Sequence, residues 1–488
     1  MYVNPFQVSM DTIIGTSMMM GHRLEDRTRI REAQDRPLIQ ALQAFSTVPL
    51  HNHRQKDLFC VAPLDILVTE QHGNKQFHLL EINGTGIGGL TNLNGEAVAS
   101  VLDCLMEMAR QTREPAPVIL VAISGKESDQ SPRLNKLVHE KILYVEALKR
   151  GFEYNGKMVH ITTMTQLLQD PRPYQTSQPT IVLGYIKDLL DNLTVTMEGR
   201  VNLLGRPVSA AINDRFCLNV IQHFHGKVDL AKFITMNRCF LAGADKGVAY
   251  ELLNEYLAGH PGRFFPKKVY SERAQTREEL IATVQRWLAE GRKAVIKPQG
   301  TGLGHGIEFF LSLAESEEQI REKVDHSLTL TEEYYHAKGG AFPYTICEYV
   351  DACCIPQPLH PLYGHKYEVR VVVYRDGFTL KAFPSIVKVA SEPFNSSRPA
   401  HLSLINNITA SSVATKTDGS EHMLPLCSRE TLALLDLHVE HLMELCAFST
   451  RFIRDILDKV QTQPERFGLP REIQIPMEVE APVEMMIA

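Results

Sequence analysis

Leu79-Leu80-Glu81-Ile82-Asn83-Gly84 is the stretch that decides the fold, taken together with the apolar run at residues 59–69 before it. The segment between them, residues 70–75, is polar and contains glycine and asparagine, which accept a positive φ in a tight turn. This pattern predicts a β-hairpin centred on Gly73. In that register Asp65 lies directly opposite Glu81, with about 5 Å between their Cβ atoms.

The predicted hairpin brings oxygen-bearing side chains together. Glu81 and Asn83 share one face, because strand side chains alternate with a period of two. The carboxylates of Asp65 and Glu81 and the amide oxygen of Asn83 then converge on one point. Hard oxygen ligands that leave positions open for phosphate suit Mg²⁺. An ordinary hairpin with a solvated acidic face is the alternative that these residues leave open.

The length and composition of the chain limit the classes of function that can be expected. The chain has 488 residues, 44% of them apolar and 22% charged, and a formal net charge of −6. Two to three domains are expected at this length, and the net charge gives no reason to expect nucleic acid or an anionic membrane as a partner. No apolar run is long enough to span a bilayer, and the N-terminus lacks the pattern of a signal peptide. The nine cysteines form no CxxC pair, so reduced thiols and a cytoplasmic location are expected.

Short apolar runs alternate with helical spacing in the first half of the chain. Helices are predicted at residues 95–110 and 135–150, and strands at residues 118–123, 160–162, 180–184 and 208–215. This alternation predicts a small, open, mostly parallel sheet. Farther along, helices are predicted at residues 216–257, 276–290 and 432–459, and strands at residues 264–270 and 294–298.

A glycine-rich loop follows the last of these strands, in Lys297-Pro298-Gln299-Gly300-Thr301-Gly302-Leu303-Gly304-His305-Gly306. Glycines at alternate positions let backbone N–H groups approach a phosphate, and Lys297 supplies a positive charge to the same anion. No GK[ST] follows, so this is not a P-loop, and residues 307–311 predict a strand where a dinucleotide fingerprint needs a helix. A flexible flap over phosphate is predicted, with a purely structural turn as the alternative.

Two later strands carry polar groups. Residues 344–350 predict a strand ending in Glu348, Tyr349 and Val350, whose backbone can meet the edge of an adenine while the carboxylate lies near a ribose. A plain core strand is the alternative.

Residues 366–374 place Lys366, Glu368 and Arg370 on one strand face, and Lys388 lies on the next strand. Facing a cleft, these charges would bind phosphates, metal and a carboxylate substrate. On the exposed face of an edge strand they would need no special role.

Taken together, these segments resemble the ATP-grasp superfamily of carboxylate–amine ligases. In that family a Lys-Pro strand and a glycine flap close over the triphosphate, a hinge strand binds adenine, and an acidic-x-Arg strand and an Asn-containing loop follow. An Asp strand and a Glu-x-Asn strand hold Mg²⁺. The resemblance implies an α/β (α+β) ATP-grasp fold and an amide-forming ligase that uses ATP and Mg²⁺. Its reaction would pass through an acyl phosphate and release ADP and phosphate.

The order of the motifs departs from most of the family, in which the Glu-x-Asn strand closes the domain. Here it comes first, so the domain is expected to be circularly permuted. This order is similar to that of eukaryotic-type glutathione synthetase, in which a small-residue loop ending in Gly-Gly-Leu contacts substrate. Residues 84–90 match that loop. The glutathione substrate itself is not carried over.

The resemblance implies a role for each matching residue. The metal ligands would be Asp65, Glu81 and Asn83, the catalytic residues Arg370 and Lys388, and the substrate-binding residues Gly84, Thr85, Gly88 and Asn407. The ATP-binding residues would be Arg215, Lys297, Gly302, Gly304, Gly306, Glu348, Tyr349, Val350, Lys366 and Glu368. Asn406 is an alternative to Asn407. Arg215 stands where the family often has the phosphate-binding lysine of an Asp-Lys pair, and Lys267 or Lys268 can share its role.

Four parts of the chain are expected on this basis. Residues 1–100 supply the permuted metal-binding hairpin and residues 101–215 form a small α/β pre-ATP-grasp substrate domain. Residues 216–350 form the nucleotide lid, and residues 351–488 form the C-terminal ATP-grasp subdomain.

The expected partners are a small-molecule carboxylate and an amine, such as an amino acid or peptide, and a homodimer is left open. Three other functions are left open. An ATP-grasp kinase would phosphorylate a hydroxyl, and a non-catalytic module would only bind ATP. A dinucleotide-dependent oxidoreductase would use Gly84-x-Gly86 as its fingerprint, although no well-placed ribose-binding acid follows.

Overall fold

A computed structural model of the chain describes residues 33–84, 90–112, 114–123, 132–175, 177–224, 227–229, 232–237, 245–260, 266–301, 304–335, 342–395, 400–404 and 420–467. The α-helices are α3 Arg36–Ser46, α4 His53–Leu58, α5 Gly95–Gln111, α6 Pro132–Tyr154, α7 Met164–Gln169, α8 Ile186–Asp191, α9 Asp214–His223, α11 Lys246–Gly259, α12 Arg277–Ala289, α13 Glu317–Tyr335, α14 Ala400–Ser403, α16 Arg429–Leu435 and α17 Val439–Thr462. Short 3₁₀ turns are η2 Leu90–Asn92, η4 Arg172–Gln175, η5 Ser420–His422 and η6 Pro464–Phe467. No helix in these ranges is long and apolar enough to cross a membrane.

The strands are β1 Val48–Pro49, β2 Val61–Gln71, β3 Asn74–Ile82, β4 Val118–Ile123, β5 His160–Thr163, β6 Thr180–Tyr185, β7 Leu193–Val195, β8 Val201–Leu203, β9 Arg206–Ile212, β10 Ile234–Thr235, β11 Ser271–Ala274, β12 Ala294–Lys297, β13 Glu308–Phe310, β14 Tyr344–Glu348, β15 Tyr367–Asp376, β16 Thr379–Val389 and β17 Met423–Pro425. They form three sheets within the described part of the chain, which is a mixed α/β fold of the α+β kind, as expected.

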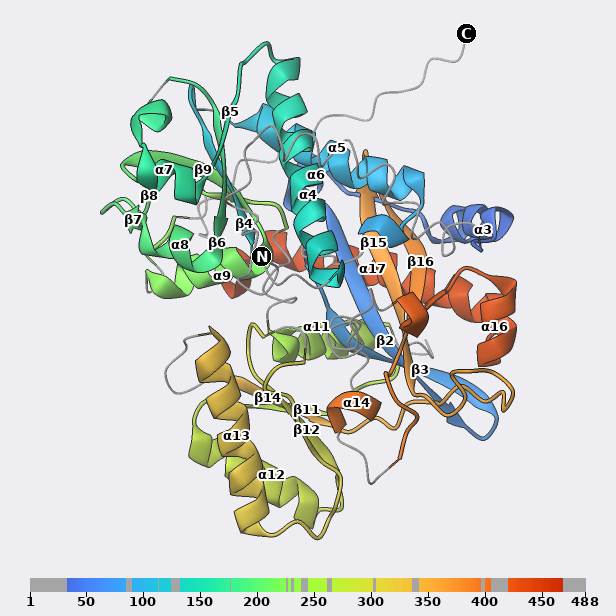
Figure 1. Ribbon diagram of the computed structural model, residues 1–488. Coiled ribbons are helices and arrows are strands. Elements are labelled where there is room, and N and C mark those ends of the chain that lie inside the picture. The colour runs from blue at the N-terminus through green and yellow to red at the C-terminus, as the bar shows by residue number, and fades with distance from the viewer. Residues whose placement is uncertain are drawn as a thin grey trace.

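The central sheet is built from the two ends of the chain. Its six strands run in the order β1-β16-β15-β2-β3, with β17 also pairing β16, and every neighbouring pair is antiparallel. The early hairpin β2–β3 thus pairs with a strand formed about 300 residues later. Figure 1 shows the blue hairpin lying directly beside the orange strands β15 and β16.

A second sheet of seven strands has the order β5-β6-β4-β9-β8-β7, with β10 beside β9. Strands β4, β5, β6, β9 and β10 are parallel, and only β7 and β8 extend the sheet in an antiparallel way. The prediction of a small, mostly parallel sheet is confirmed. One continuous apolar core runs through this sheet and the central sheet.

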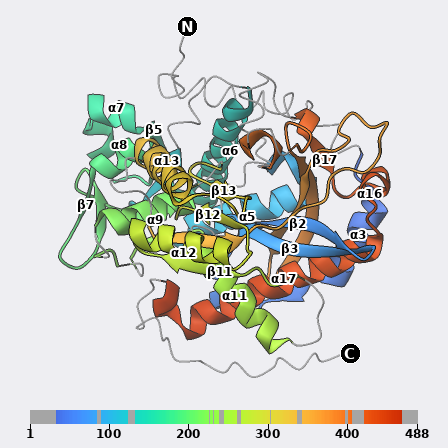
Figure 2. The same ribbon diagram turned by 90° about the horizontal axis from the view of Figure 1, so that it is seen from below.

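The third sheet forms a lobe with a core of its own. Its four antiparallel strands run β11-β14-β12-β13, and α12 and α13 pack on it around the buried Trp287. Figure 1 shows this lobe at the bottom, and Figure 2, seen from below, has its helices in front of the rest of the molecule.

Two predicted elements of this region were wrong in detail. Within its described part, residues 266–270, the strand expected at residues 264–270 does not form, and the strand lies later, in β11, whose ladder with β14 begins at the pair Ser271–Cys347. Lys267 makes a single bridge to His78 of the hairpin. The helical stretch expected at residues 216–257 is interrupted by β10, which adds to the parallel sheet beside β9.

Candidate active site

The acidic hairpin has the predicted strand pairing, but a β-bulge that was not predicted produces it. His72 and Gly73 form a two-residue turn with φ of 54° and 76°, and Gln71 pairs with Asn74. Two positive φ values are the mark of a type I′ turn, which matches the twist of the flanking strands. A bulge at Leu80 then shifts the register by one residue and places Glu81 opposite Asp65. The predicted Asp65–Glu81 pair is confirmed, and the bulge is what produces it.

Asp65 is completely buried and is surrounded by hydrogen-bond donors. Nε and Nη2 of Arg370, directly opposite on β15, donate to its two oxygens at 2.6 and 2.7 Å. Nζ of Lys388 and Nδ2 of Asn83 donate to Oδ2 at 2.8 and 3.0 Å. Burial alone would raise the pKa of Asp65, but the charges of Arg370 and Lys388 outweigh it and hold the pKa below its usual range.

Glu368 lies beside this cluster on β15, where it is paired with Lys388 of β16 both in strand register and as an ion pair. Burial raises the pKa of the Glu368 carboxyl to about 7, and the nearby negative charge of Asp65 adds to this effect, against the opposing charge of Lys388. Since β15 lies between β16 and β2, the alternative that these charges line an exposed edge strand was wrong. They are buried polar groups inside a sheet, where charges are kept only when paired.

The glycine-loop lobe meets the hairpin through two lysines. Nζ of Lys297, at the end of β12, donates to the hydroxyl of Tyr250 at 2.7 Å, and this hydroxyl donates to the carbonyl of Leu80 at 2.9 Å. Nζ of Lys246, at the start of α11, lies 3.3 Å from Oε2 of Glu81. It also donates to the carbonyl of Thr301 in the glycine loop at 3.3 Å. Thus the loop, the bulge and Glu81 face one another across the junction of two sheets.

Lys246 is a site residue that the sequence interpretation missed. It follows Asp245, whose carboxylate caps α11 by accepting from the backbone of Gly247 and Val248. Asp245-Lys246 is an Asp-Lys pair of the kind that the resemblance stated above led us to expect. The signal was therefore present in the sequence, but the pair was sought at residues 213–215. The side chain of Arg215, which lies in α9, falls outside the described part of the structure, as do Thr85, Gly88, Gly302, Asn406 and Asn407.

Of the remaining predicted nucleotide-binding residues, Glu348, Tyr349 and Val350 lie at the end of β14 in the lobe, and Lys366 directly precedes β15 of the central sheet. Nζ of Lys366 donates to Asp351 and to the carbonyl of Ala352, both at 2.7 Å. The carboxylate of Glu348 accepts from the backbone N–H of Tyr270 at 2.9 Å. The hydroxyl of Tyr349 donates to Asp351 at 3.1 Å, and Val350 follows it directly. Gly304 and Gly306 have φ of 76° and 71°, a conformation that side chains other than glycine rarely adopt.

The alternatives to Arg215 differ from Lys246 in position. Lys267 is half-buried on the outer side of the hairpin, and Lys268 is exposed with its ammonium 5.0 Å from the ring centroid of Tyr270. Among the residues that the structure describes, neither lysine contacts Glu81 or the glycine loop, whereas Lys246 contacts both.

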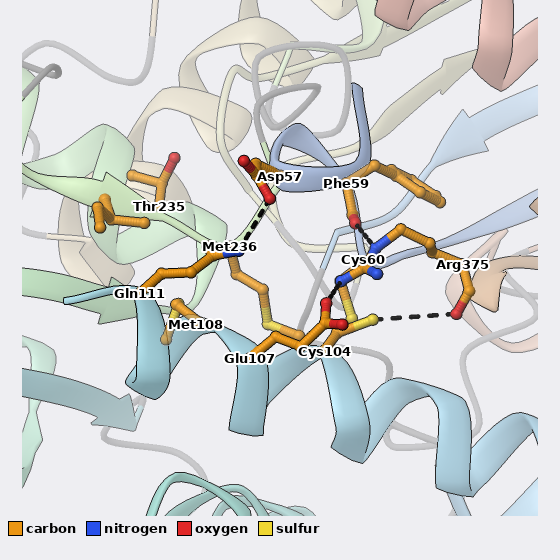
Figure 3. A pocket seen from close by; sticks show the side chains of 11 residues that line it. Asp57, Phe59, Cys60, Cys104, Glu107, Met108, Gln111, Thr235, Met236 and Arg375 are labelled. Atoms are coloured by element: carbon orange, nitrogen blue, oxygen red, sulfur yellow. Dashed lines mark hydrogen bonds and ion pairs between the residues drawn. The ribbon is translucent and has the colours of Figure 1, made fainter. Parts of the chain in front are cut away.

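A small pocket lies elsewhere, between α4, α5, β10 and the end of β15. Figure 3 shows Arg375 there, with its guanidinium bound to Glu107 and to the carbonyl of Phe59. Arg375 is five residues beyond Arg370, about 17 Å along the strand, so this pocket is separate from the acidic hairpin.

The oxygen donors at this junction meet only part of what Mg²⁺ requires. Within the described residues no group of three or more His, Cys, Asp or Glu side chains is placed to hold a metal ion. Both oxygens of Asp65 are engaged by donors. Glu81 has a side chain 25% exposed, and Nδ2 of Asn83 donates to its Oε1 at 3.2 Å, which turns the amide oxygen of Asn83 away from the two carboxylates. In this arrangement Glu81 offers the open carboxylate, and Asn83 would add its amide oxygen only with the amide turned over. Phosphate and water would supply the other ligands of an ion.

No protein-family model and no curated protein matches the chain. Among solved structures, it is similar to a candidate gamma-glutamylcysteine synthetase from Methylobacillus flagellatus, at 12% identity over 93% of this chain and 96% of that one, with a TM-score of 0.39. It is also similar to D-alanyl-alanine synthetase A from Vibrio cholerae, at 11% identity over 62% and 81% of the two chains, with a TM-score of 0.28. A D-cycloserine synthetase is similar at 12% identity over 70% and 99%, with a TM-score of 0.19.

Proposed function

We propose that this chain is an ATP-dependent carboxylate–amine ligase that forms an amide bond through an acyl phosphate. The observation that supports this most is the junction of the two sheets, where Lys246 joins Glu81 to the carbonyl of Thr301 in the glycine loop. The glycine loop and two lysines on one side, with carboxylates and an arginine on the other, suit the binding of a polyphosphate and the transfer of its terminal phosphoryl group.

The nucleotide would lie with its triphosphate under the glycine loop. Lys297 and Lys246 would bind its phosphates, and Lys246 would take the role expected of Arg215. Gly302, Gly304 and Gly306 would let the backbone approach closely. Glu348 to Val350 would border the adenine and ribose, with Lys366 and Glu368 at the phosphate end. When bound, Mg²⁺ would neutralise charge on the phosphates. Glu81 would hold it, joined by the oxygen of Asn83 once that amide has turned over.

Asp65 would not bind the metal ion directly but would orient the side chains around the metal site. Its oxygens are engaged by Arg370, Lys388 and Asn83, so it fixes the direction in which these three side chains point. It can reach an ion directly only if Lys388 or Asn83 moves away.

The reaction would proceed in two steps. An oxygen of the substrate carboxylate attacks the γ-phosphorus, and the bond to the β-phosphate oxygen breaks, giving an acyl phosphate and ADP. The amine nitrogen then attacks the acyl carbon, phosphate leaves, and the nitrogen loses a proton. Arg370 and Lys388 would neutralise the transferred group in both steps. The glycine loop would exclude water, which otherwise hydrolyses an acyl phosphate.

The same proposal includes the organisation of the chain. The hairpin at residues 59–83 would be the permuted metal-binding end of the ATP-grasp domain, within a segment spanning residues 1–100. Residues 101–215 would form the substrate domain, residues 216–350 the lid and residues 351–488 the C-terminal subdomain. In support, β2 pairs with β15, and the lobe containing α12 and α13 has its own core.

The direct test is mass spectrometry of the protein with ATP, Mg²⁺, pooled amino acids and small carboxylic acids. We expect ADP, free phosphate and a product equal in mass to two substrates less one water, with none of these formed by Lys297→Ala. ADP with a phosphorylated product would instead establish a kinase. Binding of ATP with no turnover of any substrate pool would favour the non-catalytic module.

Lys246→Ala is expected to raise the KM for ATP by about 10- to 100-fold, because a hydrogen bond to a charged group contributes roughly 1.5–3 kcal/mol. ADP formation as a function of ATP concentration measures this. Lys187→Ala is the matched control, since Lys187 is exposed on α8 and paired only with Asp191. An unchanged KM in Lys246→Ala would remove this lysine from the phosphate site.

A further inference from the structure

The small pocket around Arg375 is lined by sulfur-bearing side chains that come from three segments of the chain. Cys60 directly precedes β2, Cys104 lies on α5 with Met108 one turn later, and Met236 directly follows β10. All four are buried, with no more than 7% of any of them exposed. Figure 3 shows the sulfur atoms of Cys60, Cys104 and Met236 directed into the pocket. The pocket therefore offers soft sulfur donors, in contrast to the oxygen donors of the acidic hairpin.

The thiols of Cys60 and Cys104 each contact backbone that borders the other cysteine. Sγ of Cys60 donates to the carbonyl of Val101 at 3.8 Å, and Val101 lies on α5 about one turn before Cys104. Sγ of Cys104 donates to the carbonyl of Arg375 at 3.9 Å. The backbone N–H of Arg375 in turn donates to the carbonyl of Cys60 at 2.9 Å. Neither cysteine is in a disulfide, so both thiols are available to one ligand in the same corner of the pocket.

Asn237 fixes the position of Met236 relative to Cys60. The Asn237 side chain is completely buried, and its Oδ1 accepts from the backbone N–H groups of Cys60 and Val61 at 2.8 and 3.3 Å. Its Nδ2 donates to the carbonyl of Val61 at 2.7 Å. These three hydrogen bonds hold residue 237 against the start of β2, and they keep the adjacent Met236 beside Cys60. Donors that are already in place lower the cost of binding a ligand.

The polar groups of the pocket carry more positive than negative charge. Nη2 of Arg375, a residue 5% exposed, donates to Oε2 of Glu107 at 2.8 Å. Nζ of Lys56 lies 2.9 Å from Oε1 of the same carboxylate, so two cations share one anion. The other acid of the pocket, Asp57, is exposed at the rim and accepts from Gln111 at 2.9 Å. A positive surplus beside two thiols favours their thiolate forms.

We propose that this pocket binds one soft monovalent metal ion, Cu(I), between the thiolates of Cys60 and Cys104, with the thioether of Met236 as a third ligand. Thiolate and thioether sulfur are the donors that select Cu(I). On binding, each cysteine loses its S–H proton to solvent and forms a sulfur–copper bond, while copper stays in the same oxidation state. The resulting complex carries one negative charge, which the positive surplus of Lys56 and Arg375 over Glu107 balances.

Zinc fits this pocket less well, because a structural zinc ion needs four tetrahedral ligands. The carboxylate of Glu107 is already engaged by Lys56 and Arg375, so it is not available to complete such a set. The inference goes beyond the ligase function and does not depend on it, since the pocket is separate from the acidic hairpin.

The test titrates the reduced full-length protein with the coloured bicinchoninate complex of Cu(I) in the absence of oxygen. Loss of the colour measures transfer of copper from the chelator to the protein, and no ATP turnover is needed. We expect the wild-type protein to take up one tightly bound Cu(I). Cys60→Ala and Cys104→Ala should each weaken this binding by about 100-fold or more, since losing even an outer-shell partner costs about 10- to 100-fold in metal affinity. Met236→Leu keeps the size and apolar character of the side chain and should weaken it by about 10-fold.

Cys217→Ala is the matched control, because it removes a buried thiol that does not line the pocket, and it should bind Cu(I) as the wild type does. The adjacent thiols of Cys353 and Cys354 are partly exposed and also attract soft ions. The double variant Cys353→Ala, Cys354→Ala should nevertheless retain the tight site. Loss of the site in that double variant would overturn the inference, as would no tight uptake by the wild type or unchanged uptake in Cys104→Ala. Circular dichroism checks the fold, and Met236→Leu decides the outcome if a cysteine variant does not fold: unchanged affinity there would overturn the inference too.

Discussion

Glu81→Gln is expected to lower the rate of ADP formation by about 100- to 1,000-fold while leaving the fold intact. The glutamine has the same shape but no negative charge, so it loses both the ion pair with Lys246 and the anionic oxygen offered to Mg²⁺. The side chain is partly exposed, so little stability depends on it. Steady-state ADP formation at saturating ATP and Mg²⁺ measures the effect, and circular dichroism checks the fold.

The matched control for Glu81 is Glu70→Gln on the same hairpin. Glu70 pairs only with Lys75 near the turn, away from the junction of the two sheets. The Glu70→Gln protein should turn over ATP at the wild-type rate. Activity of Glu81→Gln within a few-fold of the wild type would rule out Glu81 as the metal ligand, and with it the placement of the phosphates under the glycine loop.

Asp65→Ala is expected to lower the free energy of unfolding by about 3–5 kcal/mol, the largest effect on stability of any substitution proposed here. The reason is that Arg370 and Lys388 remain buried when their shared anion is removed. Glu368 contacts Lys388 and can neutralise part of its charge. Most of the lost free energy of unfolding therefore comes from the unpaired charge of Arg370. Urea unfolding followed by circular dichroism measures the change, with the slope against urea compared between variants.

Two further variants separate the effect of charge from that of packing. Asp103→Ala removes an exposed carboxylate from α5 and should change stability by no more than about 0.5 kcal/mol. The quadruple variant Asp65→Leu, Glu368→Met, Arg370→Met, Lys388→Met removes all four buried charged groups of the cluster, and should recover most of the stability while remaining inactive. A fully stable Asp65→Ala protein would contradict the cluster as described.

The hairpin and the glycine loop could be predicted from sequence because both depend on local patterns. Strand alternation and the Gly73 turn are set within some twenty residues, as is the strand at 294–297 that precedes the glycines. The same holds for the small parallel sheet, in which strand runs and helical spacing alternate along the chain. By contrast, the strand expected at 264–270 depended on which backbone β14 could reach, and local pattern does not contain that information.

At the site, local sequence patterns no longer predict the contacts between residues. The pairing of Asp65 with Glu81 was predicted, but the bulge at Leu80 that produces it was not, since it depends on how Tyr250 holds the Leu80 carbonyl from another element. Lys246 stands in an Asp-Lys pair visible in the sequence. That it meets Glu81 is a contact across 165 residues, which only the packing of α11 against the hairpin creates.

The sequence by itself determined which chemical groups this protein can bring to a site: two acidic strands, a lysine before a glycine loop, and a strand carrying Glu368 and Arg370. The tertiary structure alone decided which of these groups remain available. The fold places β15 at the centre of the sheet. Arg370 and Lys388 therefore form hydrogen bonds with Asp65, and the Glu81 side chain remains partly exposed at the junction. The physical reason is that burial forces charges to pair with whichever opposite charge the strand order brings within reach.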